Sequence, residues 1–281
     1  MADLITGDTE LAATKQDMIA EVVQRELIDA SNLAGTIRDV SAFARPGNRS
    51  ISFPKGDSFT VINRASGAAG DASQITYGND KLDLDINAYL AWILDKQDVI
   101  ESNIEAELDN AQRAARAMGK YVDTQIIAEL ETVGVAATAG AISRDVILEM
   151  RRDLCKRQGR LSEMTLAIGC DDEEALLKIS QFSDADVFGR PVVEDGSLRK
   201  LYGVQVIVNT QLASGAFYMY DSEGCALGFQ QRPEMGSQSA NEYGVGSQRV
   251  AMDQKFGVKG LQIEQAGVAA GFSALVMKDG N

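Results

Sequence analysis

Apolar side chains recur every three or four positions between Asp98 and Leu130. This spacing is the period of a single helical face, so the stretch is predicted to form one long amphipathic helix. The apolar stripe consists of Ile100, Ile104, Leu108, Ala111, Ala115, Met118, Val122, Ile126 and Leu130. At 1.5 Å per residue the helix would be about 50 Å long, which exceeds the diameter of a small domain. Such a rod is typical of a protein that braces a thin, extended structure, and a compact enzyme of this size seldom needs one.

The residues ahead of this helix are predicted to form a long hairpin. Polar and apolar residues alternate at positions 50–53, after a Pro-Gly turn, and again at Phe59 and Val61. The return limb alternates most regularly around Leu84 and then becomes continuously apolar from Ala88 to Leu94. It is therefore predicted to be one strand, half exposed toward the hairpin tip and buried at its base.

The predicted tip, between Arg64 and Asn79, is rich in glycine, alanine and serine, which is typical of a mobile turn. An isolated two-stranded ribbon is at best marginally stable in water. The exposed face of this ribbon is therefore predicted to bind another copy of the protein. The candidate assembly residues of the ribbon are Phe59, Val61, Gly67, Gly70, Leu82, Leu84 and Ile86, and the key residues of the long helix are Ile100, Ile104, Leu108, Met118 and Val122.

The rest of the chain mixes helices and strands without a regular alternation, which predicts an α+β fold. A helical segment is expected from Thr9 to about Asn32, docked on the rest of the protein or on a neighbour, and a second helix from Ser143 or Arg144 to Arg157. Small or polar residues predict loops at 132–140 and 230–246. The predicted strands are Met164–Cys170, Val204–Val208, Ala216–Tyr220, Ala226–Phe229, Arg249–Met252 and Gly257–Ile263.

Composition narrows the classes of function. The 281 residues are 45% hydrophobic and carry a net charge of −14, from 41 acidic and 27 basic residues. Nucleic-acid readers normally present a basic face, so direct DNA or RNA recognition is disfavoured. No apolar run approaches the ~20 residues of a membrane-spanning helix, and the first residues lack the pattern of a secretory signal. We therefore expect synthesis in a cytoplasm.

The candidate chemistry is sparse. Histidine is absent, which removes the commonest general base and metal ligand. The three cysteines are widely spaced and are interpreted as reduced, buried side chains, and Trp92 is interpreted as a core residue. The acidic run 171–174 is interpreted as the start of a helix rather than a metal site. No catalytic residue, metal site or cofactor is predicted, and a hard cation at Asp184 and Asp186 is kept only as an alternative.

Several stretches together resemble the major capsid protein of tailed bacteriophages, which has the Hong Kong 97-like fold. They are G-N-R-S-I-S-F-P at 47–54, L-x-L-x-I at 82–86, I-x-D-x-x-D-V-I-E-S at 93–102, G-x-L-x-x-L-Y-G-V-Q-V-I-V-N-T at 196–210 and D-Q-K-F-G-V-K at 253–259. The resemblance implies an N-terminal arm at 1–44, an extended E-loop hairpin at 45–97 and a P-domain spine helix at 98–133. It further implies a region at 134–229 that is mainly A-domain, and closing strands at 230–281 that return to the P-domain.

The resemblance also implies a structural protein of the virion that self-assembles as pentamers and hexamers into an icosahedral shell. The implied partners are other copies of the chain, a separate scaffolding protein, a portal and a decoration protein, with DNA enclosed without sequence-specific binding and without a membrane. Some family members crosslink a lysine of the E-loop to an asparagine. Lys55 and Lys81 lie in or beside the ribbon, but no matching asparagine and glutamate are identified, so crosslinking is not predicted.

Two other functions remain open from the sequence. An encapsulin-like nanocompartment shell would keep the fold and change the contents. A histidine-free enzyme that binds a divalent cation at the loop aspartates would instead be a compact, small oligomer.

Overall fold

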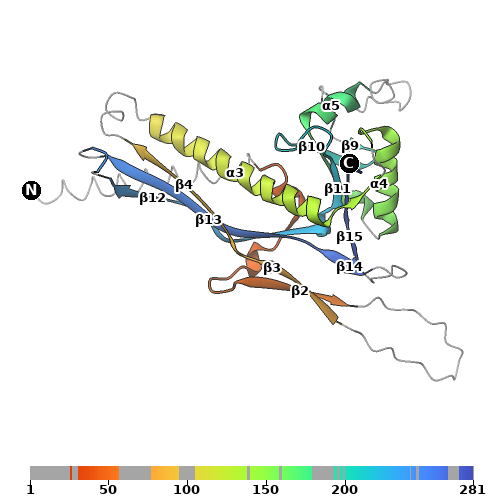
Figure 1. Cartoon of the computed structure of the whole chain (residues 1–281), viewed down its shortest axis with the longest axis horizontal. Coiled ribbons are helices and arrows are strands. Elements are labelled where there is room, and N and C mark those ends of the chain that lie inside the picture. Colours follow the sequence, from red (N-terminus) through yellow and green to blue (C-terminus); the bar gives the residue numbers. More distant parts are fainter. Residues whose placement is uncertain are drawn as a thin grey trace, which may run out of the picture.

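The computed structural model describes residues 26, 31–56, 77–94, 105–137, 140–157, 160–178, 193–194, 197–198, 200–240, 242–244, 247–264 and 272–280. The molecule is elongated, with a long helix lying on a long sheet at one end and a second sheet with shorter helices at the other (Figure 1). A two-stranded hairpin leaves the middle of the molecule and points away from both (Figure 1).

The long helix α3 runs from Glu105 to Val133, 29 residues, and packs on one face of a four-stranded sheet. The sheet has the order β1-β12-β13-β4. Its strands are β1 (Arg38–Asp39), β12 (Cys225–Ser239), β13 (Gln248–Gly260) and β4 (Ile86–Leu94). The predicted helical stripe is buried wherever the structure describes its side chains, from Ala111 to Leu130. Phe256 and Met252 of β13 lie in the same core cluster, so the amphipathic pattern dictates which face of α3 covers the sheet.

The hairpin consists of β2 (Ser50–Gly56) and β3 (Tyr77–Asp83), which pair antiparallel from Ser50 opposite Asp83 to Gly56 opposite Tyr77. Its base is packed on the four-stranded sheet of the same chain by Ile51, Leu82 and Leu84. The 3-10 turns η1 (Ala34–Thr36) and η2 (Ser41–Phe43) lead the chain past the sheet and into this hairpin.

The second sheet has the order β5-β16-β11-β6-β10-β9. Its strands are β5 (Val135–Ala136), β16 (Val276–Lys278), β11 (Tyr218–Asp221), β6 (Met164–Ile168), β10 (Val204–Val208) and β9 (Lys200–Leu201). Helix α4 (Arg144–Lys156) lies where the sequence predicts a helix. The Ser143 hydroxyl caps it by accepting the Val146 N–H, and the helix buries Val146, Ile147, Met150 and Leu154. The remaining elements are α5 (Cys170–Leu177), η3 (Leu161–Glu163), η4 (Ser222–Gly224) and the pairs β7 (Val193–Glu194) with β8 (Ser197–Leu198) and β14 (Gln262–Glu264) with β15 (Phe272–Ala274).

The predicted return strand is wrong as one unit. It divides at Leu84 and Asp85 into β3, which belongs to the hairpin, and β4, which pairs with β13. Nor is the segment from Ala88 to Leu94 continuously buried, because α3 covers only one face of β4 and leaves alternate residues exposed. Trp92 is accordingly half-buried and not fully enclosed.

Two predicted loops are also partly wrong. The polar stretch after Phe229 continues as strand β12 to Ser239, because its backbone pairs with β13 over the whole length and bulges near Pro233 absorb the irregular residues. The two predicted closing strands are accordingly one continuous β13 followed by β14. At 132–140 the long helix extends to Val133, and β5 adds an edge strand to the second sheet.

The cysteines are all free thiols, as predicted, but Cys155 and Cys170 are exposed and only Cys225 is buried. Burial raises the pKa of the Cys225 thiol to about 12, so it stays protonated at neutral pH. None of the described helices combines the length and apolar composition needed to cross a bilayer.

Candidate assembly surfaces

The base of the hairpin is rigidly joined to the main sheet. Leu82 and Leu84 are 0% and 2% exposed and pack with Val40, Ala226 and Leu261 of the same chain. The Leu84 N–H donates to the carbonyl of Arg49, which closes the hairpin at its base. Leu82 and Leu84 are enclosed and therefore do not form a contact surface. They can contribute to assembly only by holding the ribbon at a fixed angle to the sheet.

Gly257 of β13 lies directly below this corner. A Cβ atom placed on Gly257 would be 2.1 Å from the carbonyl oxygen of Asp83, far inside van der Waals contact. Only glycine allows the end of β3 to approach β13 so closely. The position at which the ribbon leaves the sheet therefore depends on the absence of a Cβ atom at Gly257.

The other predicted ribbon residues are placed less completely. Ile86 is half-buried at the start of β4 and packs against the core below α3. The remaining four, Phe59, Val61, Gly67 and Gly70, lie outside the described residues, as do Asp184 and Asp186 of the alternative cation site. Of the key helix residues, Met118 and Val122 are buried in the α3–sheet core and Leu108 lies within α3, whereas Ile100 and Ile104 precede the described part of the helix.

The free edge of β4 presents exposed apolar residues that the sequence reading missed. Tyr89 and Ile93 are 59% and 43% exposed, and Tyr121 of α3 is 40% exposed beside them. The Arg249 Nη2 atom donates to the Tyr89 hydroxyl at 2.9 Å. Two hollows of about 350 and 390 Å³ lie between β4 and α3 along this edge. Residues 88–94 are continuously apolar, so no local pattern in the sequence separates the covered face of this strand from its exposed face.

Trp92 lies at the same edge and lines one of these hollows. Its indole Nε1 is enclosed and has no hydrogen-bond partner in the described part of the chain. Burying such a donor without an acceptor costs free energy, so this edge contains an unsatisfied polar group.

Asp123 joins three parts of the fold at the middle of α3. Its carboxylate accepts hydrogen bonds from Ser31 Oγ at 2.6 Å and from Asn209 Nδ2 at 2.6 Å, and from the backbone N–H groups of Asn32 and Leu33 at 3.1 and 3.3 Å. Burial raises the pKa of Asp123 although these four bonds oppose the shift. The N-terminal segment, α3 and the end of β10 are thus held by one buried side chain.

The end of α3 is tied to both sheets. Glu131 accepts from the Tyr218 hydroxyl at 2.9 Å and pairs with Lys278, both from the second sheet. Glu129 pairs with Lys259 of β13 at 2.8 Å and also accepts the backbone N–H of Gly260. These contacts fix the position of the second sheet relative to the C-terminal end of α3.

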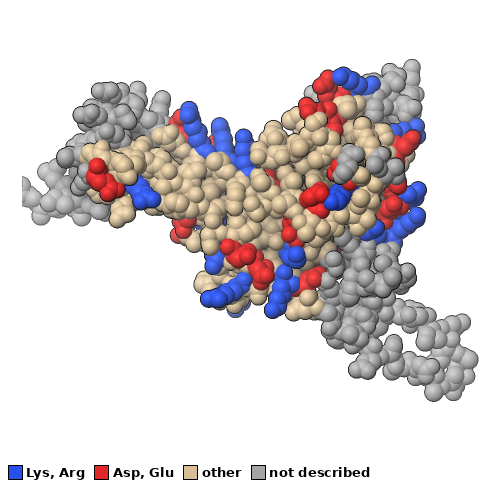
Figure 2. Space-filling model, viewed as in Figure 1, with Lys and Arg blue, Asp and Glu red and all other residues tan. Residues whose placement is uncertain are grey.

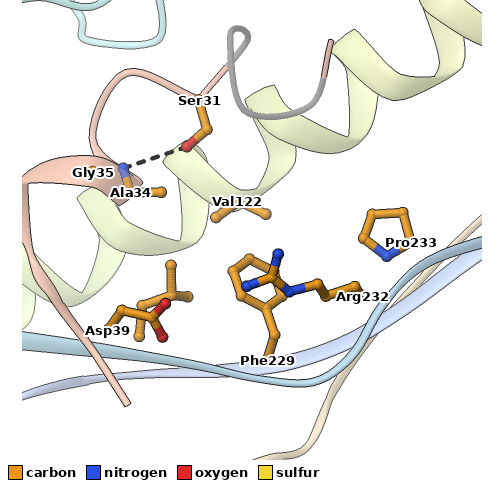
Figure 3. A pocket seen from close by; sticks show the side chains of 9 residues that line it. Ser31, Ala34, Gly35, Asp39, Val122, Phe229, Arg232 and Pro233 are labelled. Atoms are coloured by element: carbon orange, nitrogen blue, oxygen red, sulfur yellow. Dashed lines mark hydrogen bonds between the residues drawn. The ribbon is translucent and has the colours of Figure 1, made fainter. Parts of the chain in front are cut away.

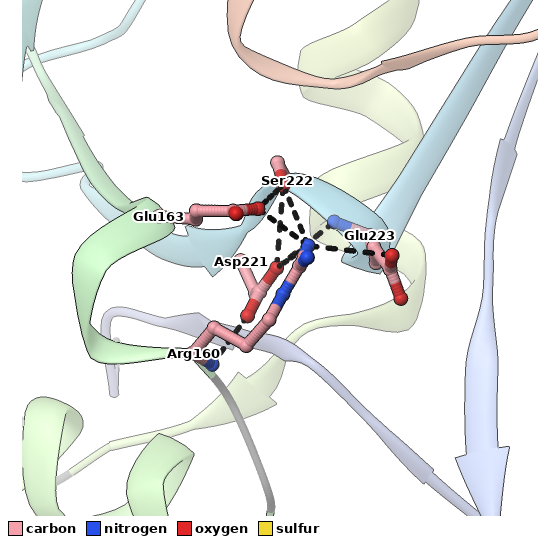
Figure 4. Close-up of polar contacts among 5 residues, drawn as sticks. All are labelled: Arg160, Glu163, Asp221, Ser222 and Glu223. Atoms are coloured by element: carbon pink, nitrogen blue, oxygen red, sulfur yellow. Dashed lines mark hydrogen bonds and ion pairs between the residues drawn. The ribbon is translucent and has the colours of Figure 1, made fainter.

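A second polar cluster holds the loop before η3 (Figure 4). The Arg160 guanidinium lies among Asp221, Glu163 and Glu223, at 3.2, 2.5 and 3.4 Å. The Arg160 backbone N–H also donates to Asp221, whose side chain is 1% exposed. Three carboxylates thus share one cation, and the arrangement fixes a loop to β11.

One further acidic side chain, that of Asp172, also has a structural role. Asp172 at the start of α5 accepts the backbone N–H of Gly215 at 3.2 Å, and burial raises its pKa. Within the described ranges, no group of three or more histidine, cysteine, aspartate or glutamate side chains is arranged to hold a metal ion. On the face shown in Figure 2, acidic and basic side chains are interspersed around the hairpin base and the second sheet, and basic side chains stand along α3.

The comparisons with known proteins address the fold. No family model matches the sequence, and no curated protein is similar to it. Solved structures do match: a chain of Mycobacterium phage Che8 has a TM-score of 0.68 and 16% identity, covering 90% of each chain. A chain from the mature capsid of bacteriophage PhiM1 has a TM-score of 0.65 and 12% identity, covering 89% of this chain and 86% of that one.

A third match is a chain from the capsid of the cyanophage P-SCSP1u, with a TM-score of 0.63 and 11% identity over 86% of this chain and 85% of that one. The matches span nearly the whole length of both partners. The chain therefore has the fold of these phage capsid structures, the Hong Kong 97-like α+β fold expected from the sequence.

Proposed function

We propose that this chain is the major capsid protein of a tailed bacteriophage, a structural subunit without catalytic activity. The observation that carries the proposal is the likeness to phage capsid structures over about nine-tenths of the chain, with similar coverage of the matched chains. An elongated subunit with a projecting hairpin fits this role, because both features extend contacts beyond the compact core.

In this proposal the chain forms pentamers and hexamers that close into an icosahedral shell around the genome. Residues 1–44 serve as the N-terminal arm, 45–97 as the E-loop, 98–133 as the spine helix, 134–229 mainly as the A-domain and 230–281 as strands returning to the P-domain. The ribbon contacts a neighbouring subunit through Phe59 and Val61, with Gly67 and Gly70 in its tip. The subunit is made in the host cytoplasm and ends in the virion, with a scaffolding protein, a portal and a decoration protein as partners.

Assembly is the direct test. The full chain is expressed alone and together with the proteins encoded beside it, and the products are examined by light scattering and electron microscopy. We expect closed shells of uniform size. A protein that stays monomeric at high concentration with its scaffolding partner supplied contradicts the proposal, and shells that hold protein cargo without a portal or DNA point to a nanocompartment.

The hairpin has its own test. Deleting residues 67–78 is expected to leave the far-ultraviolet circular dichroism and the melting of the subunit intact while preventing shell formation. Substituting Phe43, an exposed residue at 63% on the body of the subunit, by serine serves as a surface control. Unfolding of the deletion variant contradicts the separation between the packed body and the ribbon.

A further inference from the structure

An apolar pocket lies at the edge of the α3–sheet core opposite to β4. Its volume is about 280 Å³, and its walls come from η1, α3 and β12 (Figure 3). Val122, Leu227, Phe229 and Ala34 contribute apolar surface, and Ser31 and Arg232 stand at its margins. An apolar hollow of this size next to water is unfavourable unless something covers it.

The charge of Arg232 at the pocket favours a partner that carries a negative charge. The exposed Arg232 side chain lines the pocket together with Phe229 (Figure 3), and no ion pair or hydrogen bond of its guanidinium occurs within the described ranges. Among the described lining residues the one carboxylate, that of Asp39, is already used, since it accepts from the backbone N–H and the hydroxyl of Ser41 at 2.8 and 2.5 Å. A partner with an apolar side chain beside a carboxylate would satisfy both features.

Glu26, the first residue that the structure describes, lies toward the Arg232 end of the pocket. Ser31, at the pocket margin, bonds to Asp123 of α3, whereas Glu26 bonds to Arg116 at 2.9 Å and is only 20% exposed. Arg116 is seven residues, about 10 Å, nearer the start of α3 than Asp123. The far end of β12 lies toward the start of α3 as well (Figure 1), so Arg232 follows Phe229 in the same direction. The 25 residues before Glu26 therefore join the described chain at the Arg232 end of the pocket.

The sequence of that segment has the required chemistry. Residues 1–30 hold seven acidic side chains, Asp3, Asp8, Glu10, Asp17, Glu21, Glu26 and Asp29, against two basic ones, Lys15 and Arg25. Within the segment predicted to be helical, Met18 and Val22 are four positions apart, the spacing of one helical face. Glu21 is the first acid upstream of Glu26 and adjoins Val22, so an apolar group and a carboxylate lie side by side.

We propose that the N-terminal segment of the same chain, residues 9–25, docks over this pocket and closes it. Val22 covers the apolar wall at the Arg232 end, and the Glu21 carboxylate pairs with the Arg232 guanidinium. The sequence left open whether this segment docks on its own subunit or on a neighbour. The contacts of Glu26 and Ser31 within one chain favour its own subunit. This inference rests on the pocket and the charges and does not depend on the capsid function.

The segment contains its own reporters, because trypsin cleaves after Lys15 and Arg25. When a segment opens and closes faster than it is cut, the cleavage rate reports the population of the open form. In dilute, unassembled full-length subunits we expect Arg232→Gln to raise cleavage at both sites about fivefold, the factor that corresponds to about 1 kcal/mol. Ala34→Leu, which fills the pocket, should act in the same direction. Arg113→Gln, which removes an exposed arginine of α3 paired with Asp109, is the matched control and should change neither rate.

A double-mutant cycle tests the specific pair. Glu21→Gln alone should raise cleavage as Arg232→Gln does, and the double variant should be no more sensitive than either single one. Arg232→Lys, which keeps the charge, should restore most of the protection, and circular dichroism verifies that each variant is folded. Equal cleavage rates in the wild type, Arg232→Gln and Ala34→Leu overturn the proposal. Protection that disappears on dilution also overturns it, because the occupant is then a second copy.

Discussion

Asn209, at the end of β10, donates a 2.6 Å hydrogen bond through Nδ2 to the Asp123 carboxylate in the middle of α3, across 86 positions of sequence. The same carboxylate accepts from Ser31 Oγ, so one side chain connects the N-terminal segment, the long helix and the second sheet. A carboxylate at 1% exposure is unfavourable unless such donors surround it. Asp123 therefore adds polar contacts to an apolar core that these elements already share through Leu33, Val122 and Leu212.

Replacing Asp123 by alanine should destabilise the subunit by about 3 kcal/mol, because the buried donors of Asn209 and Leu33 lose their acceptor. Urea unfolding of the unassembled subunit measures the effect. Ser31→Ala removes one donor and leaves the carboxylate with the others, so its cost should be about 1 kcal/mol. Equal small losses in the two variants would contradict the central role of Asp123.

The pKa of Asp123 predicts a pH dependence with a definite sign. Burial raises this pKa above the value in the unfolded chain, so the folded state binds the proton more tightly. The contribution of Asp123 to the free energy of unfolding should therefore be largest below the unfolded value of about 3.9 and should be lost as pH rises through the folded value. Comparing the wild type with Asp123→Asn between neutral pH and pH 4 isolates this contribution from those of the other carboxylates. A difference between the two proteins that stays constant or changes in the opposite direction would show that burial does not dominate.

Gly257 should tolerate no side chain. Because its Cβ would lie 2.1 Å from the Asp83 carbonyl oxygen, Gly257→Ala should destabilise the subunit by about 3 kcal/mol and shift the base of the hairpin. Hydrogen exchange of the β2–β3 amides would show the shift, and urea unfolding the loss. Gly236→Ala on β12, where no atom lies within 4 Å of the new Cβ, is the matched control and should stay within about 0.5 kcal/mol of the wild type. Similar behaviour of both alanine variants would rule out close packing at Gly257.

Gln254 should be replaceable with a gain in stability. It is 1% exposed on β13, and neither its Oε1 nor its Nε2 has a hydrogen-bond partner in the described part of the chain. Gln254→Met keeps the approximate volume and removes the unsatisfied amide, so we expect about 1 kcal/mol of stabilisation in thermal or urea unfolding.

Gln230 is the natural comparison for this substitution. Its Nε2 donates to the carbonyls of Arg45 and Asn48 at 3.2 and 2.7 Å, so Gln230→Met should destabilise. A loss of stability on replacing Gln254 would reveal that its amide is satisfied, for example by buried water.

The long helix and its buried face were predictable, because a period of 3.6 is a local property that burial against any flat surface selects. Met118 and Val122 needed no knowledge of the partner sheet. The α4 stripe from Val146 to Leu154 was predictable for the same reason. The continuation of β12 to Ser239 was not predictable. Its polar residues are held by backbone pairing with β13, and local composition does not identify the strand with which a segment pairs.

The hairpin could be predicted only in part from local sequence. The alternation around Leu84 correctly indicated extended chain, but the same alternation is compatible with one strand or with two strands in different sheets. The division at Leu84 and Asp85 follows from a long-range contact, the approach of Asp83 to Gly257, which lie 174 residues apart in sequence. That contact also turned Leu82 and Leu84 from candidate surface residues into core residues.

For the candidate surfaces, too, some features were predictable from the sequence and others were not. Composition and the absence of histidine argued against catalysis, and the order of elements pointed to the fold, since both are properties of the linear chain. The exposed edge at Tyr89 and Ile93, the pocket beside Arg232 and the buried node at Asp123 became visible only in three dimensions. Each brings together residues separated by tens to hundreds of positions, and such proximity arises from chain packing and not from any local pattern.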